Sequence, residues 1–187
     1  SDGWQLPYER YPFATCELGG GIEVTHHRRP IIKPMDIYAV SLVKLGDGNN
    51  LVGYYMYHGG TNKIGELSTF NETKATGYPN DYPILSYDFQ APLSEYGEVR
   101  EQYGLLHMFV NDFGEEFAPM IAVDSANSVA ADDTNSLRYG MRTNGKSGFV
   151  FVNHYQRLTE LADIENAVIS AENVEFPPID VKGEVSF

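Results

Sequence analysis

The spacing of hydrophobic and polar positions changes near residue 115 and predicts two kinds of structure. Residues 12–113 contain short apolar runs that alternate with amphipathic stretches, as strands alternating with helices do. Residues 117–187 contain short runs of period two separated by turn residues, which is typical of antiparallel strands. We therefore expect an α/β region over residues 1–115 and a β-rich region, part of a sandwich, over residues 116–187.

Two apolar runs, residues 12–17 and residues 51–57, predict neighbouring parallel strands, and the second run is continuous enough for a strand buried on both faces. Three glycines at 19–21 end the first strand, and residues 58–62 end the second. The carboxyl ends of neighbouring parallel strands lie at one edge, so Glu17 and Tyr55 are expected close together. Cys16, next to Glu17, is expected to point into the core.

Two stretches predict helices. The first begins near Pro34, with Asp36 at its positive end, and stops at the glycines after residue 45. The second is expected over residues 94–113 with Ser94 as its N-cap. Its buried stripe is predicted to contain Val99, Tyr103, Leu106, Val110 and Phe113.

The β-rich region contains a hairpin signal. Residues 137–142 alternate apolar and polar positions, Asn144-Gly145 is a turn sequence, and residues 148–155 form the return strand. Two or three further short strands are expected over residues 164–187, with a turn at residues 177–178.

Length and charge exclude several function classes. The chain has 187 residues, fewer than the roughly 250 that a complete eight-stranded α/β barrel needs. With Lys+Arg 13 and Asp+Glu 26 the net charge is −13, which disfavours nucleic acid and anionic membranes as partners. No apolar run is long enough to span a bilayer. Residues 1–4 contain no secretion leader pattern, and the compartment is left open.

Several side chains are candidates for chemistry. Glu17, at a strand end beside glycines, can act as nucleophile, base or metal ligand; alternatively it is a solvated surface residue or pairs with a nearby arginine. Tyr55 can donate a hydrogen bond to such a carboxylate, or belong to the core. Tyr87 and Phe89 can stack on a ligand or fill their own loop. Cys16 is the single cysteine, so no internal disulfide is expected, and no metal site or cofactor is predicted.

Three segments together resemble the β-galactosidases of glycoside hydrolase family 35. They are PFATCELGG at residues 12–20, YMYHGGTN at residues 55–62 and SYDFQAPLSE at residues 86–95. The resemblance covers residues 10–113 well, and residues 145–157 more weakly resemble the β domain that follows the barrel in that family.

The resemblance implies that the chain is α/β, the C-terminal part of a (β/α)8 barrel followed by antiparallel β structure. It implies removal of terminal β-galactosyl residues with retention, with Glu17 as the nucleophile at the end of the seventh barrel strand. Tyr55, after the eighth strand, and Tyr87 match tyrosines near the sugar. Phe89 stands where the family commonly has a tyrosine, so the ring remains without its hydroxyl.

The family's second glutamate follows an asparagine on the fourth barrel strand, and no such pair precedes Glu17 here. The chain is therefore expected to be a fragment of a larger enzyme, inactive alone, that self-associates or pairs with the missing part of the barrel. Two alternatives stay open at this point. One is a non-catalytic carbohydrate-binding or interaction module, and the other is a related exo-β-glycosidase such as a glucosaminidase.

Overall fold

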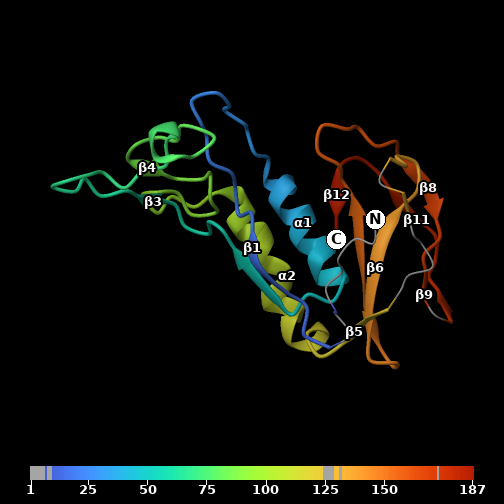
Figure 1. Cartoon of the computed structure of the whole chain (residues 1–187). Coiled ribbons are helices and arrows are strands. Elements are labelled where there is room, and N and C mark those ends of the chain that lie inside the picture. Colours follow the sequence, from blue (N-terminus) through green and yellow to red (C-terminus); the bar gives the residue numbers. More distant parts are fainter. Residues whose placement is uncertain (1–6, 8–9, 124–128, 131, 172) are drawn as a thin grey trace.

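In the part of the chain that the structure describes, two helices lie between a short parallel sheet and a four-stranded antiparallel sheet (Figure 1). This computed structural model describes residue 7 and residues 10–123, 129–130, 132–171 and 173–187, so residues 1–4, where no leader is expected, lie outside it. The elements of the first half are β1 (Ala14–Leu18), α1 (Pro34–Gly46), β2 (Leu51–Tyr54), β3 (Gly60–Thr61), η1 (Lys74–Thr76), β4 (Ser86–Tyr87) and α2 (Glu101–Phe117). Those of the second half are β5 (Ile121–Val123), β6 (Arg138–Thr143), β7 (Gly148–His154), β8 (Ile164–Ala167), β9 (Ser170–Ala171), β10 (Val174–Glu175), β11 (Ile179–Val181) and β12 (Val185–Ser186).

The predicted parallel pairing is confirmed, but the expected burial of the second strand on both faces is wrong, because Leu51 is exposed and the rest of β2 is half-buried. Strands β1 and β2 run parallel, with Ala14 opposite Leu51 and Leu18 opposite Tyr54. The register shifts between Thr15 and Leu18, and the two residues between them, Cys16 and Glu17, are exposed. Cys16 is one of them, so the prediction that it points into the core is wrong. Strand β2 is also shorter than expected and ends at Tyr54.

Helix α1 begins at Pro34, as predicted. The Asp36 carboxylate accepts a hydrogen bond from the backbone N–H of Lys33 at 2.8 Å, which satisfies a free donor at the positive end of the helix. The same carboxylate accepts the Tyr155 hydroxyl at 2.5 Å and pairs with Arg157. The N-terminus of α1 is therefore fastened to the segment that follows β7.

Helix α2 begins seven residues later than predicted, at Glu101, and its N-cap is Arg100. The Ser94 hydroxyl caps a separate turn instead, because it accepts the backbone N–H groups of Tyr96 and Glu98. Val99 is 68% exposed and lies outside the helix, so its place in the buried stripe is wrong. Of the remaining stripe, Leu106 is buried and Tyr103 half-buried, whereas Val110 and Phe113 are exposed.

The predicted hairpin is confirmed. Strands β6 and β7 pair from Arg138 opposite Asn153 to Thr143 opposite Gly148, with Asn144-Gly145 in the turn. Gly145 adopts φ +82°, the left-handed conformation that favours glycine. Strands β5 and β12 flank this hairpin in an antiparallel sheet with the order β12-β7-β6-β5. The described residues 164–171 and 173–187 form five short strands rather than two or three.

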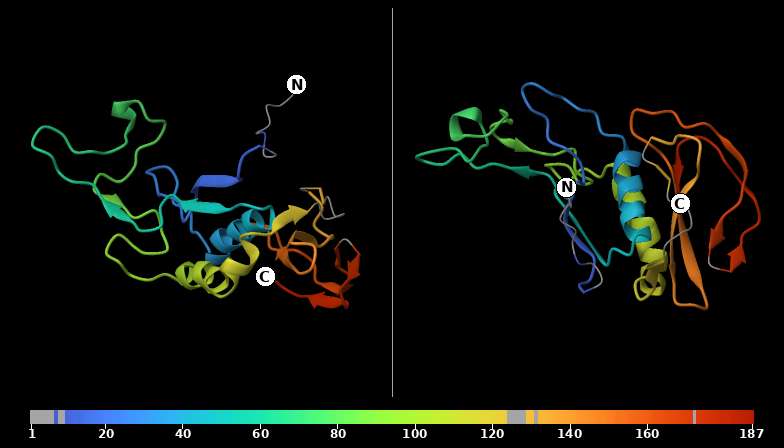
Figure 2. Two further views of the ribbon diagram at one scale, coloured as in Figure 1. Left: turned by 90° about the horizontal axis from the view of Figure 1, so that it is seen from below. Right: turned by 45° about the vertical axis from the view of Figure 1, so that its right-hand side comes forward.

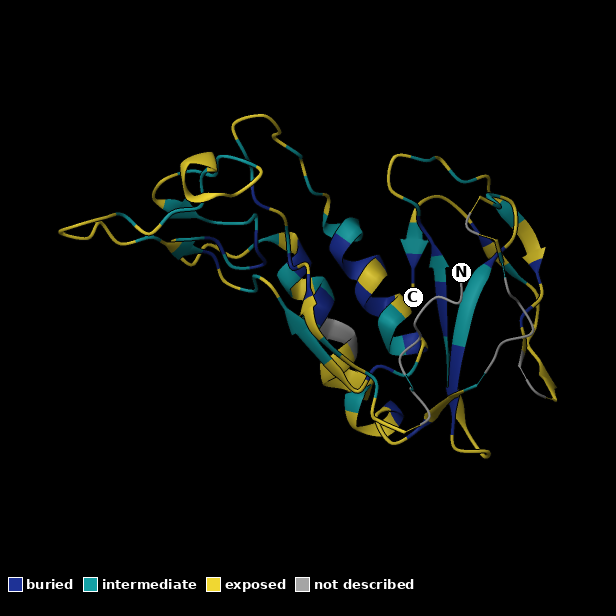
Figure 3. Cartoon of the chain, in the orientation of Figure 1, coloured by how far each residue is buried: buried dark blue, intermediate teal, exposed yellow. Residues whose placement is uncertain are grey.

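The two faces of β7 belong to two cores, as its period of two requires. Phe151 packs with Tyr38, Leu42, Phe117 and Met120 between the sheet and the helices. Its neighbour Val152 packs on the opposite face with Leu137, Ala167, Ile169 and Val181. Figures 2 and 3 show α1 and α2 along the sheet and the buried residues concentrated there, whereas the loops around β3 and β4 are mostly exposed or half-buried. No helix among the described residues is both long and apolar enough to cross a membrane.

Arg142 of β6 is 1% exposed and fills the space beneath the ends of both helices. Cations suit these ends, because the last carbonyl groups of a helix have no partner within it. The guanidinium donates to the backbone oxygens of Leu45 (3.2 Å), Asn49 (3.1 Å), Ala118 (3.0 Å) and Met120 (3.0 Å) and to Oδ1 of Asn50 (2.7 Å).

Replacing this guanidinium is expected to destabilise the whole chain. Arg142→Met leaves several buried oxygens without a donor, which costs on the order of 3 kcal/mol of unfolding free energy in urea denaturation. Lys146→Met, in the exposed hairpin turn, is the control and should change that free energy by less than about 0.5 kcal/mol. Equal effects of the two substitutions would show that the Arg142 contacts do not hold the fold.

Candidate functional site

Glu17 lies in the irregular part of β1, near the carboxyl end of the strand, and is exposed. Among the described residues no side chain hydrogen-bonds to its carboxylate, and no ion pair joins it to Arg28 or Arg29. Irregular pairing of this kind re-aims side chains at strand ends. The Glu17 carboxylate is therefore open to a molecule arriving at this edge of the sheet.

Tyr55 follows β2 directly, and its backbone N–H donates to the Leu18 carbonyl at 2.8 Å. The strand ends that bear Glu17 and Tyr55 are thus adjacent, as predicted. The Tyr55 hydroxyl, however, lies 2.6 Å from that of Tyr87 rather than on the Glu17 carboxylate. The structure therefore pairs two of the predicted site residues through their hydroxyl groups.

Tyr55, Tyr87 and Phe89 form one aromatic cluster. The ring of Phe89 lies 5.4 Å from that of Tyr55 and 4.6 Å from that of Tyr87 between centroids. Tyr87 donates its hydroxyl to Oε1 of Glu72 at 3.1 Å, which leaves Tyr55 to donate to Tyr87. Burial raises the pKa of Tyr87, and the neighbouring Tyr55 hydroxyl and Glu72 carboxylate raise it further, so Tyr87 stays protonated at neutral pH.

Two glycines bring the three sequence segments into contact. A side chain at Gly20 would overlap the carbonyl oxygen of Met56, and one at Gly21 would overlap that of Phe89. Only glycine permits so close an approach of two backbones. The loop after β1 therefore packs directly against the segment after β2 and against the Phe89 backbone.

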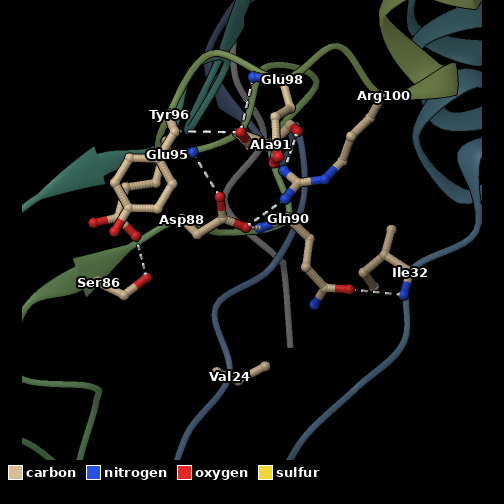
Figure 4. Close-up of polar contacts among 12 residues, drawn as sticks. Val24, Ile32, Ser86, Asp88, Gln90, Ala91, Glu95, Tyr96, Glu98 and Arg100 are labelled. Carbon is tan, nitrogen blue, oxygen red and sulfur yellow. Dashed lines mark hydrogen bonds and ion pairs between the residues drawn. The ribbon is translucent and has the colours of Figure 1, made fainter.

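Phe89 is held in a left-handed backbone conformation, with φ +56°, and Gln90 follows at φ +51°. Such values are uncommon outside glycine and persist where the surroundings enforce them. Figure 4 shows the contacts around this pair: Asp88 bonds to Arg100 at 2.8 Å and accepts the backbone N–H of Gln90 at 3.1 Å. The Gln102 side chain donates to the Gln90 carbonyl at 2.9 Å. These bonds hold the backbone from which the Phe89 ring projects.

Glu95, expected in the first turn of a helix, instead joins two short strands. It accepts the hydroxyl of Ser86 in β4 at 2.7 Å and that of Thr61 in β3. Its own backbone N–H donates to Asp88 at 2.7 Å. The carboxylate of Glu95 therefore ties the β3–β4 ladder to the turn that positions Phe89.

Residues 5–113 match the sequence profile of glycosyl hydrolases family 35. The chain belongs to this family. Beta-galactosidase 10 of Arabidopsis thaliana is 39% identical over 69 residues, which are 36% of this chain and 8% of that protein. The matched segment thus spans a small part of the relative's length.

The family 35 match includes Glu17, Tyr55, Tyr87 and Phe89, the residues singled out from the sequence. Each lies at or beyond the carboxyl end of a strand of the parallel pair, or in the loop that packs against it. Among the described residues, no group of three or more His, Cys, Asp or Glu side chains is arranged to hold a metal ion.

One buried acid of this family 35 chain, Glu23, is not predicted from the sequence pattern. It is 6% exposed, and its Oε1 accepts the backbone N–H of Val24 at 2.8 Å. Burial raises the pKa of the Glu23 carboxyl, the N–H groups of Val24 and Phe89 lower it in part, and the charges of Asp88 and Glu95 add to the rise. The available signal was a lone carboxylate between apolar Ile22 and Val24, two residues after the last of three glycines.

The raised pKa makes a prediction about stability. A carboxyl whose pKa is higher in the folded than in the unfolded chain stabilises the fold at low pH, and this contribution disappears as pH rises through the folded value. Glu23→Gln carries an uncharged amide at every pH. Its free energy of unfolding should therefore rise relative to that of the wild type between acidic and neutral pH. The comparison requires urea denaturation across this range, with exposed Glu66→Gln as control. Parallel pH profiles for the wild type and Glu23→Gln would contradict it.

Proposed function

We propose that this chain is the nucleophile-bearing part of a retaining β-galactosidase. The observation that carries the proposal is the family 35 match over the segment in which the loop after β1 packs on Met56 and Phe89. That packing supports a site in which Glu17 and the aromatic cluster share one edge of the parallel pair. Aromatic rings beside an open carboxylate suit a sugar, whose ring stacks on them while its hydroxyl groups bond to polar tips.

In this proposal Glu17 attacks the anomeric carbon of a terminal β-galactosyl residue and forms a covalent galactosyl-enzyme. The leaving oxygen needs a proton from a second carboxyl group, held about 5–5.5 Å from the first in retaining enzymes. Water, deprotonated by that second carboxylate, then releases galactose with retained configuration. The second carboxyl group would come from the rest of the barrel, because no Asn-Glu pair precedes Glu17 in this chain.

The aromatic cluster would contact the sugar in the same site. Tyr55 and Tyr87 carry hydroxyl groups that are already polarised along the chain to Glu72. Phe89 offers a ring without a hydroxyl group, so it can stack on the sugar and cannot bond to it. This difference bears on which β-hexoside is preferred, and a panel of β-galactosides and β-glucosaminides distinguishes the proposed sugar from the alternative.

The parallel pair supports the view that the chain is part of a larger barrel. Parallel strands are normally buried on both faces, yet Ala14 and Cys16 of β1 and Leu51 of β2 are exposed. Among the described residues β1 and β2 pair only with each other, so each has an open edge. Further barrel strands would cover both the edges and the exposed face. We also propose that the α/β region gives way to the β-rich region near residue 115, close to the end of α2 at Phe117.

The nucleophile assignment is tested in the full-length protein that contains this chain. A 2-fluoro-galactoside that traps the galactosyl-enzyme should label Glu17, detected by peptide mass spectrometry, because only the attacking carboxylate forms the ester. Glu17→Gln should lose the label and turnover, and exposed Glu66→Gln should keep both. The 187-residue chain alone should not hydrolyse a chromogenic galactoside. A label on another carboxylate, or turnover by the chain alone, would refute the assignment.

Open strand edges also predict association. Unpaired edges together with exposed Leu51, Val110 and Phe113 present apolar surface that a second chain can cover. We expect the 187-residue chain to form dimers or larger species, or to bind the preceding part of its barrel, when examined by light scattering. A concentration-independent monomer would count against this part of the proposal.

A further inference from the structure

Glu72 is connected to the candidate site by two hydroxyl groups in series. Its Oε1 accepts the Tyr87 hydroxyl at 3.1 Å, and the Tyr87 oxygen lies 2.6 Å from that of Tyr55. Glu72 belongs to the long loop between β3 and β4 and lies just before η1 (Figure 1). Tyr55 follows β2 and Tyr87 ends β4, so three separate segments of the chain meet in this series of bonds.

The carboxylate of Glu72 decides in which direction the hydroxyl protons of this series point. An ionised carboxylate only accepts hydrogen bonds, so Tyr87 donates its single hydroxyl proton to Glu72. The Tyr87 oxygen then accepts the proton of Tyr55. Each bond in such a series polarises the next one. Tyr55 is therefore left with its oxygen lone pairs, and without a proton, for any further neighbour.

The loop between β3 and β4 holds Glu72 in place through its backbone. The Glu72 carbonyl accepts the backbone N–H of Tyr82 at 3.1 Å. The next residue, Thr73, is the N-cap of η1: its backbone N–H donates to the Thr76 hydroxyl at 3.1 Å, and that hydroxyl donates to the Thr73 carbonyl at 2.9 Å. Among the described residues no basic side chain forms an ion pair with Glu72, so Tyr87 is its hydrogen-bond partner.

The aromatic rings are packed, whereas their hydroxyl protons are free to turn. The rings of Tyr55 and Tyr87 meet edge to face at 6.5 Å between centroids, and Phe89 lies against both. A hydroxyl proton rotates to suit whichever acceptor is present. Without the Glu72 carboxylate, the Tyr87 proton can turn toward Tyr55. The Tyr55 proton is then released beside the strand end that bears Glu17.

We propose that Glu72 is a positioning residue that acts through Tyr87 and keeps the Tyr55 hydroxyl proton away from the Glu17 carboxylate. The proposal rests on the proposed function, because it takes Glu17 to be the nucleophile. A hydrogen bond from Tyr55 would draw negative charge from the attacking oxygen and slow its attack on the anomeric carbon. With that proton held on Tyr87, the lone pairs of Glu17 stay available for the attack.

The test measures how fast a saturating 2-fluoro-galactoside labels Glu17 in the full-length protein that contains this chain. Glu72→Ala should slow the first-order labelling step about five- to tenfold, the effect of one hydrogen bond. The inhibitor concentration that gives half the maximal rate should not change, because the substitution alters the attack and not the binding. Glu72→Gln keeps an acceptor oxygen and should retain most of the rate. Glu66→Gln, an exposed carboxylate of the same loop, should leave the rate unchanged.

Tyr87→Phe separates the series of hydroxyl groups from the charge of Glu72, because it keeps the carboxylate and removes its connection to Tyr55. It should slow the labelling step as much as Glu72→Ala does. The double variant should be no slower than either single variant, since Glu72 acts only through Tyr87. Tyr87→Phe also serves as the test if Glu72→Ala fails to fold.

Labelling of Glu17 at the wild-type rate in Glu72→Ala, or losses that multiply in the double variant, would overturn the role of Glu72 and leave the nucleophile assignment standing. Equal losses in Glu72→Ala and Glu72→Gln with none in Tyr87→Phe would show that the charge acts directly through space, which also overturns it. A label on a carboxylate other than Glu17 would instead refute the nucleophile assignment, and the role of Glu72 with it.

Discussion

The buried guanidinium of Arg142 is the contact on which the placement of the site depends. It bonds to carbonyl groups at the ends of both helices and to the backbone oxygen of Asn49. Asn49 is itself buried, donates to the Thr15 hydroxyl in β1 and accepts the backbone N–H of Leu51 in β2. One hydrogen-bond network therefore fixes the positions of β6, of the ends of both helices and of the start of β1 and β2 relative to one another. A fully satisfied network of this kind is rigid.

At the carboxyl ends of β1 and β2, close contact between backbones holds the following segments together. Gly20 and Gly21 let the first loop touch Met56 and Phe89, and the Asp88–Arg100 pair holds the turn behind that contact. The candidate site thus lies between two rigid constraints, one below the strands and one above them. Loops held in this way can carry an exposed carboxylate without losing its position relative to the aromatic rings.

Local patterns predicted the elements whose signals lie within a few residues. Pro34 marked the start of α1, and Asn144-Gly145 marked the hairpin, because each depends on its own backbone preference. The start of α2 was misjudged because the Ser94 hydroxyl can cap a turn as well as a helix. Arg142 alternates with apolar neighbours and so resembles a solvent-facing residue. Its burial depends on helix ends far away in the sequence, and the environment of Glu23 depends on the equally distant segment around Phe89. No local pattern reports such contacts.

Glu17 and Glu23 show how one loop can give two carboxylates different chemistry. They are six residues apart, yet Glu17 lies on an exposed, irregular strand end, whereas Glu23 is buried and its Oε2 has no hydrogen-bond partner among the described residues. An exposed carboxylate can approach an electrophilic carbon freely. A buried carboxyl, beside two other acids, is poorly suited to carry charge and better suited to hydrogen bonding with a neutral group. Gly20 and Gly21, between them, let the chain approach the Met56 and Phe89 backbones so closely that one acid stays on the exposed strand and the other is buried near Phe89.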